Sequence, residues 1–166
     1  MQTAPLSDAA KQKLNAVLSR YPNAMAACLP ALHLARAEYG HLGDDVVKLV
    51  ADHLALPVAH VHGVVTFYTM FRREPSGQNV LRVCTNISCM LRGGYEILGA
   101  VERELGIKPG QTTPDGCFTL IEEECLAACA NAPMMICGAR YFLDLVPEKM
   151  PELLAELRQT PQTELV

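Results

Sequence analysis

Two short stretches decide the fold and the chemistry of this chain of 166 residues: 83–94, VCTNISCMLRGG, and 124–134, ECLAACANAPM. Each stretch carries a pair of cysteines, spaced C-x4-C in the first and C-x3-C in the second: Cys84, Cys89, Cys125 and Cys129. Each pair begins at or just past the end of a predicted β-strand and occupies the loop that follows. Adjacent strand ends place such loops side by side, so we expect the four thiols to converge.

The sequence around these pairs predicts a small α/β sandwich. Residues 80–84 and 117–122 are strand-like, and between them a helical stripe begins at Gly94 and ends at Gly106. The Gly138-Ala139 dipeptide predicts a two-residue hairpin loop, because glycine at the first position suits a type II′ turn. A last helix is indicated by apolar residues at helical spacing: Met150, Leu153, Leu154 and Leu157.

The first half of the chain predicts four helices. Ser7-Asp8 can cap the first, and the second spans about residues 24–39 and stops at Gly40. Asp44-Asp45 opens the third helix and Pro57 favours the start of the fourth. The apolar residues of these segments recur every three or four positions, which is typical of helices packed on one face.

The period of the pattern changes after a charged, turn-rich segment at residues 72–77, which predicts a linker. We therefore expect an α+β protein with two parts. A helical N-terminal bundle covers residues 1–74, and an α/β domain that carries the cysteine pairs covers residues 75–166.

Composition excludes several classes of protein. Half of the residues are hydrophobic and 19% are charged, which excludes a disordered chain. The formal net charge of −4 does not support nucleic-acid binding, and no apolar run is long enough for a direct membrane span. The first fifteen residues lack the pattern of a secretory signal, so we expect a reducing compartment. Seven cysteines cannot all pair, and they need another role: metal binding, redox chemistry or burial.

Four cysteine thiolates are the usual ligands of an iron–sulfur cluster, and two local pairs suit a [2Fe–2S] centre, in which each iron takes two protein sulfurs. Structural zinc also accepts four thiolates at these spacings, although zinc sites more often show C-x2-C twice. A thiol oxidoreductase would normally carry C-x-x-C, which is absent from the pairs. The spacing alone therefore favours a metal site and leaves iron–sulfur and zinc as alternatives.

The sequence resembles the small [2Fe–2S] subunit of the NADH-oxidising module of respiratory complex I. The resemblance runs from about Leu14 to Leu157 and rests on both cysteine stretches, on PALHL at 30–34 with Gly40 after it, and on GVVTFYTMF at 63–71. It implies a helical region followed by a thioredoxin-like ferredoxin domain. It also implies that one [2Fe–2S] cluster is held by four ligands: Cys84, Cys89, Cys125 and Cys129.

The resemblance implies a partner as well. This would be a flavoprotein subunit that carries FMN and the NADH site, and our chain would exchange electrons with that flavin. The chain would then be cytoplasmic and peripheral to the inner membrane as part of the complex. The same family supplies subunits of NAD-linked hydrogenases and formate dehydrogenases, but the short chain without an extra ferredoxin domain favours the respiratory complex.

The remaining chemistry-bearing residues predict no catalytic site. The chain lacks a Gly-rich phosphate motif, so we expect no NADH or flavin site of its own. Cys28, Cys117 and Cys137 match no ligand position and are expected to be buried, although the latter two could substitute as ligands in a mutant. His60 and His62 do not share a helix face, which disfavours a metal pair. The family usually has glycine where this chain has Ala127, which points to a positive φ or a close approach to sulfur.

Two further stretches allow both a structural and a functional interpretation. Residues 64–71 are apolar and aromatic, and we expect core packing first and a contact surface for the flavoprotein second. The acidic run at 122–124 is expected to be a solvated edge. If one of its carboxylates lay near a cluster, it would disfavour the addition of an electron and lower the reduction potential.

Overall fold

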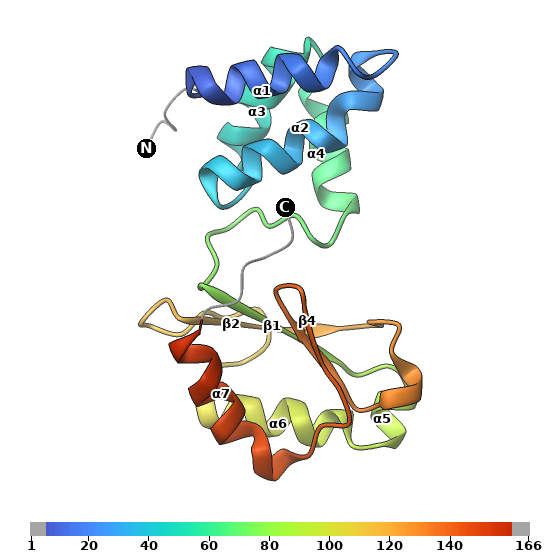
Figure 1. The fold of residues 1–166 in the computed structure, drawn as a ribbon, viewed down its shortest axis with the longest axis vertical. Helices are drawn as coiled ribbons and strands as arrows, with labels where there is room; N and C mark the ends of the chain where they lie inside the picture. Colours follow the sequence, from blue (N-terminus) through green and yellow to red (C-terminus); the bar gives the residue numbers. More distant parts are fainter. Residues whose placement is uncertain (1–5, 161–166) are drawn as a thin grey trace. The chain divides into compact units, whose positions relative to one another are not determined.

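The computed structural model describes residues 6–160, which belong to two compact units, one ending at Pro75 and the other beginning at Ser76 (Figure 1). The α+β fold class is confirmed, with helices alone in the first unit and a four-stranded sheet with helices in the second. The first unit contains four helices: α1 (Asp8–Leu18), α2 (Ala24–Tyr39), α3 (Asp44–Leu54) and α4 (Val58–Phe67).

Local capping explains where these helices begin and end. Ser7 accepts a hydrogen bond from the Ala10 backbone N–H at 3.1 Å, which caps α1 as the sequence predicts. Gly40 ends α2 in a left-handed conformation with φ 77°, which glycine adopts without a Cβ penalty. The starts of all four helices and the end of α2 agree with the prediction within two residues, because caps and periodicity are local signals.

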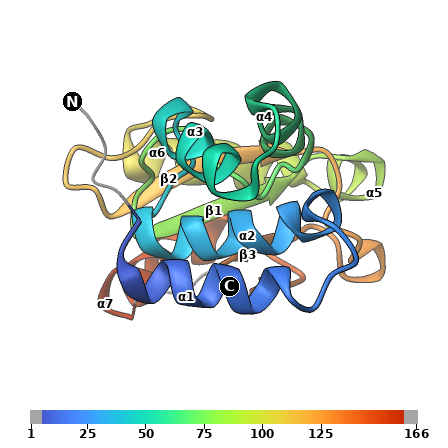
Figure 2. The ribbon, with the colours of Figure 1, turned by 90° about the horizontal axis from the view of Figure 1, so that it is seen from above.

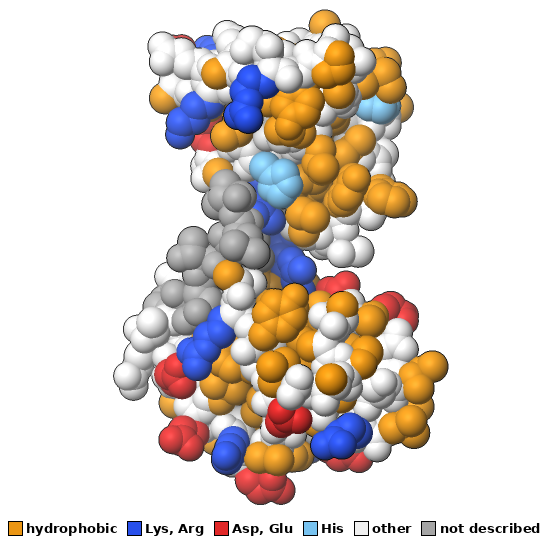
Figure 3. Space-filling view, turned by 45° about the vertical axis from the view of Figure 1, so that its right-hand side comes forward, with side chains coloured by type: hydrophobic (Ala, Val, Ile, Leu, Met, Phe, Trp, Pro, Cys, Tyr) orange, Lys and Arg blue, Asp and Glu red, His pale blue; other side chains and the backbone are white. Residues whose placement is uncertain are grey.

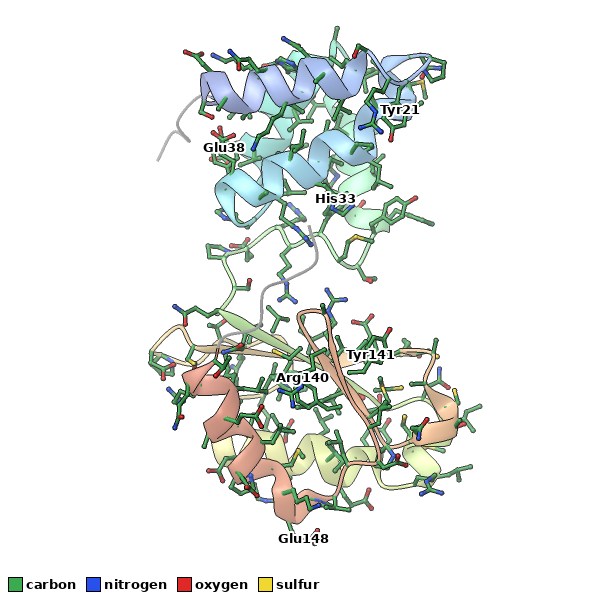
Figure 4. The ribbon with its side chains drawn as sticks, in the orientation of Figure 1. Tyr21, His33, Glu38, Arg140, Tyr141 and Glu148 are labelled. Carbon is green, nitrogen blue, oxygen red and sulfur yellow. The ribbon has the colours of Figure 1, made fainter. Side chains whose placement is uncertain are left out.

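The helices of the first unit enclose one apolar core. Figure 2 shows α1 and α2 lying side by side, with α3 and α4 next to them. His33, labelled in Figure 4, comes from α2, and its ring stacks edge-on against Phe71 with centroids 5.0 Å apart. Burial and the nearby Arg36 lower the pKa of His33 below its usual value. The fully buried side chains of this core include Leu14, Leu32, Leu42, Val47 and Val50.

The second unit is a mixed sheet with helices on one face (Figure 1). Its core joins the inward residues of the strands to the two longer helices, and Phe118, Leu120 and Ile97 are fully buried there. The elements are β1 (Asn79–Cys84), α5 (Ile87–Leu91), α6 (Gly94–Leu105), β2 (Phe118–Glu123), β3 (Met135–Cys137), β4 (Arg140–Phe142) and α7 (Met150–Gln159).

The order of the strands places the cysteine segments. The sheet runs β2-β1-β3-β4, with β1 and β2 parallel and the other two pairs antiparallel. In the parallel pair Asn79 lies opposite Phe118 and Cys84 lies opposite Glu123. The carboxyl ends of β1 and β2 therefore meet at one edge of the sheet, and both cysteine stretches start from that edge.

Two details of this unit extend the sequence analysis. The predicted hairpin is present between β3 and β4, and Gly138 in its loop has φ 58°, as its position in a type II′ turn requires. The helix α5 was not predicted, because the segment that follows Cys84 was expected to be a loop. Five residues are too few to show a helical period, and so short a helix depends on tertiary packing.

Candidate metal centre

The first cysteine pair lies on regular secondary structure. Cys84 is the last residue of β1, and Cys89 lies within α5 rather than in a loop. Asn86 starts this helix by accepting a hydrogen bond from the Ile87 backbone N–H at 2.6 Å. Cys84 is 4% exposed and Cys89 is 2% exposed, so both thiols of this pair are buried.

A glycine brings the next helix against this pair. A Cβ at Gly94, the first residue of α6, would lie 2.9 Å from the carbonyl oxygens of both Cys84 and Cys89. Any side chain at this position would therefore collide with the backbone of both cysteines. Gly94 allows the close chain approach that the sequence analysis expected around the first pair.

The second cysteine pair lies in a loop and is exposed. Cys125 follows the end of β2 by two residues, and Cys129 opens a single 3₁₀ turn, Cys129–Asn131. Between them Ala127 has φ 61°, in the left-handed region that favours glycine. The positive φ that the sequence analysis inferred for this position is present, and an alanine adopts it.

Hydrogen bonds join the two segments. The Cys84 backbone N–H donates to the Met134 carbonyl at 3.2 Å, and the Thr85 N–H donates to the Glu123 carbonyl at 3.2 Å. The Cys84 thiol lies 3.8 Å from the Glu124 carbonyl oxygen. Cys84, Cys89 and Met134 also pack together in a small buried cluster with Ala132. The pairs are thus held at the same edge of the sheet by residues about 40 positions apart.

The environment of Cys89 makes its thiol hard to ionise without a metal. Burial raises the pKa of Cys89 to about 11, and the neighbouring thiol of Cys84 and the charge of Cys129 add to this. Cys84 and Cys129 therefore both lie near enough to Cys89 to affect the pKa of its thiol. Within residues 6–160 no three histidine, cysteine or acidic side chains already form a group that could hold a single metal ion. Binding of a metal would have to displace protons from the thiols.

Comparisons with known proteins identify the family of the chain. The family model for the thioredoxin-like [2Fe–2S] ferredoxin matches residues 14–158. The chain belongs to this family. It is 42% identical to a subunit of the NADH-quinone oxidoreductase of Rhizobium meliloti (strain 1021) over 148 residues, which cover 89% of this chain and 88% of the relative. It is 38% identical to a subunit of the NADH-quinone oxidoreductase of Escherichia coli (strain K12), with 90% of each chain covered.

A solved structure has the same fold. The chain aligns with the crystal structure of an NAD+-reducing [NiFe]-hydrogenase in the H2-reduced state with a TM-score of 0.67 and 21% identity, over 80% of this chain and 22% of that one. The family resemblance and the thioredoxin-like fold of the second unit are therefore confirmed. The relatives are subunits of oxidoreductase complexes, and the cofactor of a thioredoxin-like [2Fe–2S] ferredoxin is a [2Fe–2S] cluster.

The residues present fit such a cluster. The donors are four thiol sulfurs in two local pairs, which is the ligand type and grouping that a two-iron centre uses. The absence of a Cβ at Gly94 lets the chain pack closely against the backbone of the first pair. The assignment of all four cysteines as ligands stays a prediction that Cys-to-Ser variants test.

The other candidate residues lie elsewhere. Cys28 is buried in the helical unit, and burial raises its thiol pKa. Cys117 and Cys137 are also buried, as predicted, and their positions in the sheet disfavour the suggested use as substitute ligands. Cys117 directly precedes Phe118, which pairs with Asn79 at the opposite end of β1 from Cys84, about 16 Å along the strand. Both thiols instead contact the buried side chain of Asn79.

Residues of the acidic run at 122–124 and His62 make contacts within the chain. Glu122 accepts a hydrogen bond from the Thr85 hydroxyl at 2.8 Å, and Glu123 lies beside Cys84 in the sheet. The run therefore borders the cysteine edge rather than lying away from it. His62 on α4 faces Asp44 at 3.9 Å. The sequence analysis predicted neither α5 nor the hydrogen bond from Thr85 to Glu122. Asn86, a residue type that often caps helices, was the one local signal for α5.

Proposed function

We propose that this chain is an electron-transfer subunit of NADH:quinone oxidoreductase (complex I) and that four cysteines hold its [2Fe–2S] cluster: Cys84, Cys89, Cys125 and Cys129. The observation that carries the proposal is the meeting of two cysteine pairs at the carboxyl ends of the parallel strands β1 and β2. The names of the relatives, which are 38–42% identical and matched over most of their length, support the assignment to this complex.

When bound, the cluster supplies a one-electron couple whose total charge, thiolates included, changes from about −2 to about −3. The residues of the chain hold and shield it. Buried Cys84 and Cys89 close one side against water, whereas exposed Cys125 and Cys129 lie where a partner can approach. Electron exchange through this exposed side is the chemistry that the arrangement supports.

The partner that we propose is the flavoprotein subunit that carries FMN and binds NADH. Large apolar side chains stand exposed beside the first cysteine pair: Ile87 is 67%, Leu91 75% and Tyr95 52% exposed. Apolar side chains that surround a redox site and face solvent are typical of a surface that a partner covers. The collar formed by these three residues is therefore our candidate contact around the cluster.

The helical unit offers a second apolar surface. Figure 3 shows hydrophobic side chains gathered on its visible face. Within the stretch 64–71, Val65 and Phe71 are buried in the core, but Phe67 is 77% exposed. Residues of α4 around Phe67 line a shallow hollow of about 430 Å³. Core packing thus accounts for Val65 and Phe71, and Phe67 is the residue of this stretch that we propose for contact with the partner.

The proposal includes a location. Within residues 6–160 the structure contains no helix that is long and apolar enough to cross a bilayer. Assembly into the complex would hold the chain at the cytoplasmic side of the inner membrane through its partner, as the family resemblance implies.

The first experiment tests the cofactor. The chain is expressed under anaerobic conditions, and its iron, zinc, acid-labile sulfide and visible spectrum are measured. We expect about two irons and two sulfides per chain and a red-brown colour that dithionite bleaches. A colourless protein with about one zinc that cannot be reconstituted with iron and sulfide would favour the structural zinc module instead.

The second experiment tests the partner. Leu91→Glu places a charge in the collar, so we expect cluster content to stay unchanged and co-purification with the co-expressed NADH-binding flavoprotein to fall by tenfold or more. Met25→Glu is the matched control, because Met25 is 59% exposed on α2, in the helical unit that carries none of the four cysteines. Equal retention of the partner by both variants would exclude the collar as the contact.

A further inference from the structure

One arginine joins the two cysteine segments. Arg92 directly follows α5, and its backbone N–H donates to the Cys89 carbonyl at 3.1 Å. Its side-chain Nε–H donates to the Ala132 carbonyl at 2.8 Å, 40 residues further along the chain. Ala132 comes three residues after Cys129. A single residue is thus bonded to the end of both ligand segments.

The acceptor of this bond is buried, which makes the contact specific. Ala132 is 0% exposed and packs with Cys84 and Cys89. A buried carbonyl without a donor would cost free energy, and a hydrogen bond from a charged group is stronger than one from a neutral group. The guanidinium is therefore bonded to a residue that packs directly against both buried cysteines, Cys84 and Cys89.

The charge of Arg92 has no acidic partner within residues 6–160, where it forms no ion pair. Two other arginines of the same unit are paired, Arg140 with Glu156 and Arg158 with Asp115, whereas Arg82 and Arg103 form no ion pair in the described residues. No acidic side chain in the described part of the chain therefore neutralises the charge of Arg92, and only solvent screens it. A fixed positive charge near a redox centre stabilises the more negative, reduced state.

We propose that Arg92 is a positioning and potential-setting residue: its Nε–H holds the second ligand segment against the first, and its charge favours the reduced centre. This inference rests on the proposed function, because it needs the four cysteines to hold a cluster. It goes beyond that function by assigning the redox equilibrium to a residue that is not a ligand.

Three variants separate the bond from the charge. Arg92→Lys keeps the charge, Arg92→Gln removes the charge but keeps a side-chain donor, and Arg92→Met removes both. Arg103→Gln is the matched control. Arg103 is exposed near the end of α6, nine residues beyond Gly94 and therefore about 13 Å further along the helix.

Each variant is loaded with cluster and equilibrated with a redox indicator dye and dithionite, so that each centre takes one electron and one ferric iron becomes ferrous. We expect Arg92→Gln and Arg92→Met to shift this equilibrium about tenfold towards the oxidised form, which equals about 59 mV for one electron. Arg92→Lys and Arg103→Gln should stay within twofold of the parent. Iron release to a chelator should be several-fold faster in Arg92→Met alone.

The outcomes distinguish the two proposals. If the parent chain holds about two irons and two sulfides but Arg92→Gln and Arg92→Met match Arg103→Gln in both readouts, the inference about Arg92 is wrong and the proposed function stands. If the parent chain cannot be loaded at all, the proposed function fails and the inference fails with it. A shift that Arg92→Lys prevents supports the role of the charge.

Discussion

The two cysteine segments present the same chemical group in opposite settings. Cys84 and Cys89 lie on a strand and a helix and are 4% and 2% exposed, whereas Cys125 and Cys129 lie in a loop and are exposed. The two cysteines of the first segment are held in a buried cluster with Ala132 and Met134. The second depends on a few hydrogen bonds and on one residue with a positive φ. The contrast indicates that the first pair is preorganised and that the second pair closes the site.

The largest effect should come from removing the ligands themselves. Cys84→Ser and Cys89→Ser should lose nearly all of the cluster, because the serine oxygen is a poorer ligand for iron than a thiolate and water cannot reach the buried side to assist it. Cys125→Ser and Cys129→Ser should retain a minority of the iron with a changed visible spectrum, because solvent can supply an oxygen ligand there. Iron and sulfide analysis measures the difference.

Cys117→Ser is the matched control for these variants. It removes a buried thiol from the same unit, at the far end of the sheet, and it should keep the full cluster content. Equal and complete loss in all four ligand variants would show that exposure does not distinguish the pairs.

The next effect concerns the packing of the first segment. Gly94→Ala should destabilise the chain by about 1–3 kcal/mol and reduce cluster loading, because the new Cβ would meet backbone atoms of both cysteines at 2.9 Å. Gly99→Ala on the same helix should be neutral or stabilise by about 0.5–1 kcal/mol, since its Cβ would meet only the end of a flexible arginine at 3.3 Å. Urea denaturation of both variants tests this contrast.

A smaller effect, of opposite sign, is expected in the second segment. Ala127→Gly should stabilise the chain by about 0.5–1 kcal/mol, because a left-handed alanine costs about 1–2 kcal/mol and the entropy of glycine offsets only part of that. It should also slow iron release to a chelator. Ala128→Gly, where φ is −113°, should only destabilise. If both variants destabilised the chain equally, the φ of Ala127 would not be a source of strain.

The smallest effect is expected from removing the hydrogen bond between Asn131, which follows Cys129 by two residues, and Asp144. The Asn131 side chain donates to the Asp144 carboxylate at 2.9 Å in an exposed position. Asn131→Ala should therefore cost only about 0.5 kcal/mol of stability and should leave the reduction equilibrium unchanged. A loss above about 2 kcal/mol in urea denaturation would mean that this bond, rather than packing, holds the loop.

The helix and strand boundaries were largely predictable from the sequence. Ser7, Gly40 and Gly106 mark helix ends through local capping, and the structure places helix ends at all three. The strands that precede each cysteine pair were predicted for the same reason, since strand patterns span only a few residues. The family resemblance, which the comparisons confirm, rests on the motifs around these boundaries.

The parts of the site that could not be predicted depend on residues distant in sequence. The helix α5 forms where Cys89 packs against Ala132 and Met134, more than 40 residues away. The bond from Arg92 to Ala132 joins the same distant segments. The position of Cys117 and Cys137 is a further example: both thiols contact Asn79, at the opposite end of β1 from Cys84, and the sequence does not show at which end of the sheet each residue lies.

The sequence by itself determined the elements, the spacing of the two cysteine pairs and the family, because these follow from short-range patterns and side-chain chemistry. Only the tertiary structure decided that β1 and β2 are parallel neighbours, that one pair is buried while the other is exposed, and that an arginine without an ion pair in the described residues lies between them. Burial and adjacency arise from contacts between segments about 40 residues apart, and no local pattern in the chain encodes them.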